Sequence, residues 1–304
     1  TRCSRDWSSD VCSSDLGSQA FRRRTLLLGR NFVMDASAGE RKTFSNGFRI
    51  FLRIVIVLSA AGVAVFAFLL FRSAREYAQG DAAYEQVRSA VSVEAVAPEG
   101  EAGVSGAAPE ETALSIDFDA LREINPDVVG WILSEGNAIS YPVVQGEDND
   151  YYLTHLFDGE QNKLGSVFMD FRSSSDFSDS NTVLYGHNMR DGSMFSALTN
   201  YADQSYYDRF PAMTLYTPEG NYTVELFAGI LTDGQSGLIC RTFGGDGEFQ
   251  EYVDALKESS TFSCDVSVVP GDRIVTLCTC SYAYDDARYL LFGKLTPLEA
   301  SSAE

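Results

Sequence analysis

The segment TLCTCSYAYDDAR, residues 276–288, gathers the residue types best suited to chemistry in this chain. Cys278 and Cys280 flank one threonine, and Arg288 follows eight residues after Cys280. A cysteine pair can bind metal, form a disulfide or supply a nucleophilic thiolate. Zinc sites usually space their cysteines by about two to four residues on a turn, whereas this pair lies in a run with strand character. We therefore expect neither a metal ion nor a cofactor, and from this segment alone both a nucleophile and a buried structural thiol stay open for Cys280.

The chain has two histidines, His155 and His187. His187 follows an apolar run in VLYGHNM, and the glycine before it lets the chain turn, which would place the imidazole at the rim of a sheet. Cys280 ends the run RIVTLCTC, and Arg288 begins the next apolar run. If these two runs pair as a hairpin, Cys280 and Arg288 fall side by side at one rim. We interpret His155 as a surface or packing residue.

Short apolar runs dominate the second half of the chain. A helix is expected over 116–124, where Asn125-Pro126 closes it, and helical pieces are expected near 193–201 and 247–258. Eight short strands with few helices between them favour a closed antiparallel barrel over a doubly wound sheet. The expected strands are 138–144, 165–170, 182–186, 213–217, 221–232, 266–269, 273–280 and 289–295.

A membrane anchor is expected near the N-terminus. Residues 54–71 form an uncharged run of 18 residues, roughly the minimum length of a membrane-spanning helix. Basic residues are concentrated before this run, so the positive-inside rule places the N-terminus in the cytoplasm and everything after residue 72 outside. A cleaved signal peptide is the alternative. We favour an uncleaved anchor because the apolar run is long and no small-residue cleavage site directly follows it.

The composition of the outer part, residues 115–304, excludes nucleic-acid-binding proteins and disulfide-built scaffolds. Residues 1–114 hold 13 Lys+Arg and 13 Asp+Glu, whereas residues 115–304 hold 10 and 30, so the whole net charge of −20 lies on the outer part. Such a surface repels nucleic acid and anionic lipid head groups. Its cysteines are too sparse for a disulfide-built scaffold, although a single Cys240–Cys264 bridge stays open.

These observations predict a division of the chain into segments. The first twenty residues lack periodicity and resemble translated sequencing-adapter sequence, so Met34 is an alternative start. A stretch rich in Ala, Gly, Glu and Pro over 92–113 cannot bury enough surface to order itself, and it is interpreted as a linker. The expected segments are 1–20 (non-native), 21–53 (basic cytoplasmic tail), 54–71 (anchor), 72–113 (stalk and linker), 114–298 (catalytic domain) and 299–304 (tail).

Three motifs in this order, VLYGHNM, TLCTC and the later Arg288, stand behind an N-terminal anchor and resemble the sortases, the cysteine transpeptidases of Gram-positive cell surfaces. The sortase signature Thr-Leu-x-Thr-Cys is met by residues 276–280. The segment NDYYLTHLFDGEQNKLGSVFMDFRSS and the N-terminal helix look like class B, and the resemblance covers 115–297. Class B commonly has serine where this chain has Cys278.

The resemblance implies a sortase-type barrel of about eight strands and a role for each residue of the motifs. Cys280 is the implied nucleophile, His187 the general acid and base, and Arg288 the holder of substrate and oxyanion. These roles agree with thiolate, imidazole and guanidinium chemistry. A weaker substrate contact is implied for Thr279, and we also expect weak substrate contacts from Asn188 and Ser281, because they flank His187 and Cys280.

The implied reaction cleaves a sorting motif of the Pro-x-Thr type after threonine and forms a thioacyl enzyme. An amine of a peptidoglycan precursor such as lipid II, of the cross-bridge, or of a pilin lysine then takes the acyl group. The implied partners are surface proteins that carry the motif, at the cell membrane through residues 54–71. A hydrolytic cysteine protease using the same thioacyl step and a non-catalytic exported binding domain are the alternatives.

Two neighbouring features have competing interpretations. Cys278 is either a small core residue or the partner of Cys280 in a strained, reversible disulfide. The acidic pair Asp285-Asp286 either tunes Arg288 or is solvated on its loop, and we favour solvation.

Overall fold

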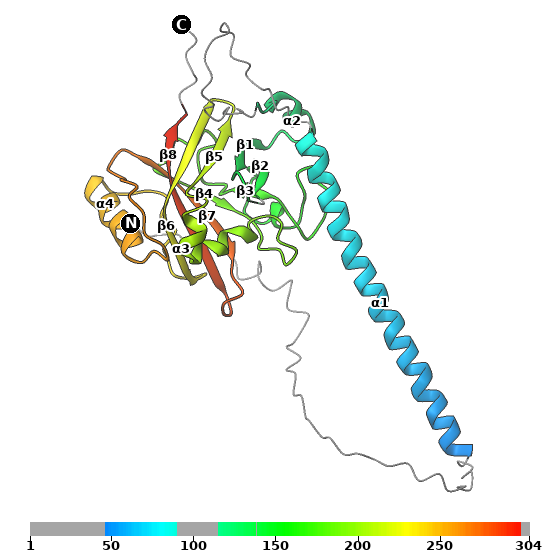
Figure 1. The fold of residues 1–304 in the computed structure, drawn as a ribbon. Coiled ribbons are helices and arrows are strands. Elements are labelled where there is room, and N and C mark those ends of the chain that lie inside the picture. The colour runs from blue at the N-terminus through cyan, green and yellow to red at the C-terminus, as the bar shows by residue number, and fades with distance from the viewer. Residues whose placement is uncertain (1–45, 90–114, 138, 299–304) are drawn as a thin grey trace, which may run out of the picture. The chain divides into compact units, whose positions relative to one another are not determined.

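A computed structural model describes residues 46–137 and 139–298 except 90–114 (Figure 1). The predicted segments 1–20, 92–113 and 299–304 lie outside the described residues, as does most of the predicted basic tail. The described chain divides into two compact units, with the boundary between Tyr77 and Ala78. Each unit is considered by itself below.

The first unit consists of the N-terminal part of α1 (Asn46–Ser89). The predicted anchor, 54–71, is helical and exposed along its whole length. In the described ranges α1 is the one helix long and apolar enough to cross a membrane, with a mean hydropathy of 2.9 in its most apolar window. Its length and composition are therefore compatible with a membrane anchor.

The last turns of α1, from Ala78 on, belong to the second unit. The buried Tyr84 hydroxyl donates a hydrogen bond to the Gly165 carbonyl at 2.6 Å, and the Tyr84 ring meets the edge of Tyr141 at 5.3 Å. Gly80 lies so close to Leu164 that an added Cβ would come within 2.6 Å of a leucine methyl. The domain start predicted at residue 114 thus leaves out a segment that contacts the barrel.

The second unit is built on a closed barrel of eight strands, ordered β1-β2-β3-β4-β7-β8-β6-β5. The closed barrel of eight strands is confirmed. Its predicted antiparallel character is wrong, because β2 pairs with β3 and β4 pairs with β7 in parallel. The strands are β1 (Val128–Leu133), β2 (Ser140–Val144), β3 (Val167–Met169), β4 (Asn181–Tyr185), β5 (Ala212–Thr217), β6 (Gly220–Asp233), β7 (Arg273–Cys280) and β8 (Ala287–Pro297).

One predicted strand is absent from the described barrel and one barrel strand was not predicted. The run 266–269 joins no ladder, because the Val266 carbonyl accepts from Lys257 and the Val269 amide donates to the Asp272 carboxylate. Strand β1 was missed because Gly130 interrupts its apolar pattern. A Cβ added to that glycine would lie 3.0 Å from a backbone oxygen, and the β1–β2 register shifts beside it; close backbone approach and register shifts are where a strand tolerates glycine.

Helices occupy the connections between strands. The predicted helix near 193–201 is a 3₁₀ helix, and the one predicted over 247–258 is α4, which buries Phe249, Val253 and Leu256 at helical spacing. α4 lies in the long crossover from β6 to β7 (Figure 1). Together, the helices of this unit that follow α1 are α2 (Phe118–Ile124), η2 (Tyr151–Leu153), η3 (Ser196–Ala202), α3 (Gln204–Tyr207) and α4 (Asp246–Glu258).

The parallel pair β4 and β7 is buried along almost its whole length. Every residue of β4 is buried, and so is every residue of β7 after Arg273. A strand covered on both faces reads as a continuous apolar run rather than an alternating one. This pair provides the rigid support for the residues that follow its ends.

The Cys240–Cys264 bridge left open above does not form. Cys264 carries a thiol, and its Sγ donates a hydrogen bond to the Phe227 carbonyl at 3.3 Å.

Candidate active site

Three strands bring the predicted chemical residues to one rim of the barrel. β4 and β7 run in parallel with Tyr185 opposite Cys278, so the residues two positions further on, His187 and Cys280, stand at the same level. β7 and β8 are antiparallel, with Cys280 directly opposite Arg288. The structure therefore has the hairpin register expected from the sequence and adds the parallel strand that carries His187.

Hydrogen bonds fix the chain around Cys280. Its side chain is buried, and its carbonyl accepts from Nδ2 of Asn188 at 2.8 Å. The Tyr282 hydroxyl donates to the Asn188 carbonyl, also at 2.8 Å. Cys278 and Cys280 both carry thiols. Asn188, predicted as a weak substrate contact, thus ties the segment after His187 to the end of β7.

The imidazole of His187 is oriented by a backbone carbonyl. Its Nε2 lies 2.7 Å from the carbonyl oxygen of Leu153, in η2. Because a carbonyl can only accept, Nε2 carries the proton, and Nδ1 is the nitrogen that can gain and lose one. Sequence reasoning missed Leu153, since a backbone group leaves no residue-type signal.

His155 has a different environment from His187. Its ring stacks on Tyr151 with centroids 4.0 Å apart, and its Nδ1 donates to the Tyr151 carbonyl at 2.7 Å. This arrangement fits the packing role interpreted for it.

Arg288 is buried and engaged in an ion pair. Its side chain is 2% exposed, with Nη2 at 2.9 Å from Oδ1 of Asp286 and Nη1 donating to the Ala287 carbonyl at 3.2 Å. The guanidinium borders a cavity of about 20 Å³ that is also lined by Tyr185 and Leu238. This cavity has room for about one water molecule, and its arginine stands opposite Cys280.

The interpretation of Asp285-Asp286 as a solvated pair is half wrong. Asp285 is exposed, whereas Asp286 is half-buried and pairs with Arg288. Asp286 also has φ 60°, in the left-handed region that Asp and Asn tolerate best among residues with a side chain. Gly234 donates its amide to the Asp286 carbonyl at 2.9 Å, which holds this turn against the end of β6.

The two remaining predicted contacts, Thr279 and Ser281, make hydrogen bonds within the protein. Thr279 is fully buried, and its hydroxyl donates to the Gly186 carbonyl at 2.7 Å, immediately before His187. Ser281 accepts from the Ala283 amide at 3.3 Å and is half-buried. Thr279 therefore positions the histidine segment.

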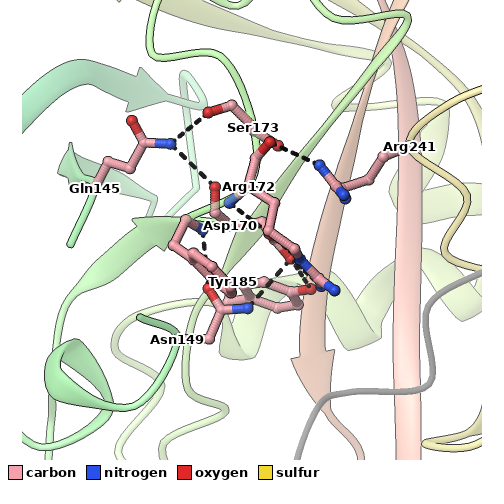
Figure 2. A network of polar contacts seen from close by, with 8 residues as sticks. Gln145, Asn149, Asp170, Arg172, Ser173, Tyr185 and Arg241 are labelled. Atoms are coloured by element: carbon pink, nitrogen blue, oxygen red, sulfur yellow. Dashed lines mark hydrogen bonds and ion pairs between the residues drawn. The ribbon is translucent and has the colours of Figure 1, made fainter. Parts of the chain in front are cut away.

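A buried ion-pair network lies next to the site (Figure 2). The Asp170 carboxylate, which follows β3, accepts from Arg172 Nη2 at 2.8 Å, from Asn149 Nδ2 at 3.2 Å and from the Tyr185 hydroxyl at 3.1 Å. Arg241 donates to the Arg172 carbonyl at 2.8 Å. The network thus connects the β6–β7 crossover with the end of β4. Its members were not predicted, because each is an ordinary polar residue in its own segment.

Charge states in this network follow from burial and pairing. Burial acts to raise the pKa of Asp170, but hydrogen bonds from Arg172 outweigh it and hold that pKa below its usual value. Burial, together with the negative charge of Asp170, raises the pKa of Tyr185 well above its usual value. Tyr185 therefore stays protonated and donates to an ionised carboxylate.

A larger groove opens on the His187 side of the rim. It encloses about 680 Å³, and its lining includes Asn188, Met189 and Tyr282. We call it the His-side groove. Through Asn188 it adjoins the backbone of Cys280.

Known proteins resemble this chain in sequence and in fold. No family model matches the chain. It is 38% identical over 177 residues to Sortase B of Listeria monocytogenes, which covers 58% of this chain and 72% of the relative. A Staphylococcus aureus sortase B–substrate complex matches with a TM-score of 0.57 at 36% identity, over 60% of this chain and 85% of that one. A sortase B complexed with triglycine matches with a TM-score of 0.57 at 36% identity, over 60% and 86%.

The closed mixed barrel and these relatives define a cysteine transpeptidase of the sortase type. Within that class, the chain belongs to the sortase B family. The class B resemblance found in the sequence motifs is therefore confirmed.

Proposed function

We propose that this chain is a membrane-anchored sortase that forms a thioacyl intermediate on Cys280 and passes it to an amine. The observation that carries the proposal is the convergence of Cys280, His187 and Arg288 on one rim, supported from three different strands. Residues 54–71 would hold the enzyme in the membrane with the N-terminus in the cytoplasm.

In the first half-reaction the Cys280 thiolate attacks the carbonyl carbon of the threonine in the sorting motif. The carbonyl oxygen becomes negative in the tetrahedral state, and the fixed donors of Arg288 stabilise it there. The leaving amine must collect a proton, and protonated His187 supplies it from Nδ1, since Nε2 donates to Leu153. The carbon–nitrogen bond breaks and the thioester remains.

In the second half-reaction an amine attacks the thioester. Neutral His187 takes the proton that the amine loses, and the Cys280 thiolate is released. The proposed donors are surface proteins with a Pro-x-Thr type motif, and the proposed acceptors are amines of lipid II, of the cross-bridge or of a pilin lysine. Two related structures, a sortase B–substrate complex and a sortase B–triglycine complex, support donor and amine partners in general.

Product analysis tests this proposal. The full chain in detergent is incubated with a library of sorting-motif peptides, with and without an amine, and mass spectrometry identifies the products. We expect cleavage after threonine, an amine adduct, and a thioacyl adduct that Cys280→Ala abolishes. Cleavage with water as the sole acceptor would identify a hydrolytic protease instead, and no cleavage of any peptide would contradict both.

A further inference from the structure

The side from which the amine approaches follows from proton chemistry. The leaving amine receives its proton from His187, and the incoming amine gives one to the same nitrogen. Both amines must therefore lie on the His187 side of Cys280, away from the Arg288 cavity. This step rests on the proposed function. The His-side groove begins at that place, because Asn188 and Met189 line it and directly follow the histidine.

The charge of the groove differs from that of the surrounding domain. Residues 115–304 hold 30 Asp+Glu against 10 Lys+Arg. The described lining of the groove nevertheless contains two arginines, Arg190 and Arg209, and neither Asp nor Glu. Asp191 lies next in sequence to Arg190 but is outside the lining, and its Oδ1 accepts from both the amide and the hydroxyl of Ser193.

The two arginines lie over aromatic rings, and the one acid that acts on either of them, Asp203 near Arg209, does so without an ion pair among the described residues. Arg190 lies over the ring of Tyr282 at 5.6 Å, and Arg209 lies over Tyr206 at 5.5 Å. Arg209 also donates from Nε to the Ser205 carbonyl at 3.3 Å. Among the described residues neither arginine has a carboxylate within ion-pair distance, in contrast to Arg172, Arg288 and Lys294, which each pair with an aspartate.

A guanidinium placed over a ring keeps its planar fork of donors available to a carboxylate. We propose that the His-side groove binds the amine acceptor, and that Arg190 and Arg209 select acceptors that carry a carboxylate in addition to the attacking amine. In a domain that otherwise repels anions, this groove is where such an acceptor is attracted. Arg190 and Arg209 are thus specificity determinants of the second half-reaction.

A pair of acceptors that differ in one charge tests the proposal. The full chain in detergent, with a peptide that it cleaves, is supplied with either triglycine or triglycinamide at increasing concentration. The measured quantity is the kcat/KM of each acceptor, from the ligated product. We expect triglycine to be favoured about five- to tenfold, as expected for a charge-assisted hydrogen bond weakened by solvent. The preference should decrease as salt is added.

Variants of the two arginines test whether these side chains cause the preference for triglycine. Arg190→Gln and Arg209→Gln should each reduce the preference for triglycine, and Arg190→Lys should retain part of it. Arg122→Gln is the matched control, because Arg122 is exposed on α2, with only a loose contact to Asp119 at 3.9 Å. It removes one charge from the same unit and should leave the preference unchanged. Thermal unfolding of each variant confirms that the fold is kept.

Two results would overturn the inference. One is equal use of both acceptors by the wild type, and the other is an undiminished preference in the Arg190→Gln, Arg209→Gln double variant. Both leave the proposed function intact, because cleavage and ligation still occur. Absence of cleavage, or cleavage without ligation of either acceptor, would instead contradict the proposed function and this inference with it.

Discussion

Two aspartate–arginine pairs beside the rim have opposite patterns of burial. In Asp170–Arg172 the carboxylate side chain is 0% exposed and the arginine 21%, whereas in Asp286–Arg288 the arginine is 2% exposed and the aspartate 34%. In the first pair the buried acid accepts hydrogen bonds from several elements (Figure 2). In the second the buried base stands opposite Cys280.

This difference indicates what each pair contributes. A buried carboxylate saturated with donors has no capacity left for a ligand, so Asp170 holds the fold together. A buried guanidinium with a half-exposed partner can exchange part of its pairing for a substrate oxygen. The comparison therefore predicts that the two pairs differ in which property changes when they are altered, namely stability for the first and turnover for the second.

Between the two pairs, the largest expected effect is on turnover. Arg288→Ala should lower kcat by about 10² to 10³, the usual loss for an oxyanion donor, while circular dichroism shows that the fold is kept. Arg288→Lys should recover little, because a point charge cannot replace the planar fork. A fully active lysine variant would show that charge alone suffices and that the proposed geometry is wrong.

The next effect is on stability. Asp170→Asn leaves Arg172 next to a neutral amide in a buried network, so the free energy of unfolding should fall by about 3 to 5 kcal/mol, measured by urea denaturation. Turnover by the molecules that remain folded should change far less than in Arg288→Ala. A loss of activity without a loss of stability would remove the distinction between the two pairs.

The same pair predicts a pH dependence. The pKa of Asp170 is lower in the folded protein than in the unfolded chain. Its contribution to stability is therefore fully present above the unfolded value of about 3.9 and is lost as the pH falls through the folded value. Stability measured as the pH is lowered from about 5 through about 3.9 and below should fall less steeply in Asp170→Asn than in wild type.

These two pairs also show how far the sequence alone could lead. Cys280 and Arg288 were predicted as neighbours, because one hairpin register determines their relation. His187 was placed at the rim from its position after a strand, although the parallel pairing of β4 with β7 was not predicted. Parallel pairing depends on a long crossover, which leaves no local pattern in either strand.

The features of the site that were not predicted depend on contacts between segments far apart in the sequence. Asp170 and Tyr185 are fifteen residues apart, and the Leu153 carbonyl is thirty-four residues from His187. No spacing rule relates such positions. The partnership of Asp286 with Arg288 was interpreted wrongly because a left-handed turn directs one acid inward and leaves its neighbour exposed.

A smaller effect is expected for the acidic member of the second pair. Asp286→Asn keeps the left-handed turn, since asparagine also tolerates that conformation, but it removes the charge that orients Arg288. We expect kcat for cleavage to fall about tenfold with little change in KM, because orientation of an oxyanion donor matters most in the transition state. Asp285→Asn is the matched control and should be neutral. If the two variants lowered kcat equally, Asp286 would have no role in orienting Arg288.

The smallest expected effect on activity concerns Cys278, which belongs to neither pair. It is fully buried, stands opposite Tyr185 across β4 and β7, and precedes Cys280 by two positions on one strand. Cys278→Ser should keep substantial activity, whereas Cys280→Ala should abolish turnover.

In an extended strand the two Cα atoms lie about 6.6 Å apart, close to the upper limit of about 6.8 Å for a disulfide, so a bridge would be strained and easily reduced. Mild oxidation followed by mass mapping should reveal a Cys278–Cys280 linkage that the serine variant lacks. If oxidised protein shows no such linkage, or if Cys278→Ser inactivates as readily as wild type, Cys278 is a core residue and nothing more.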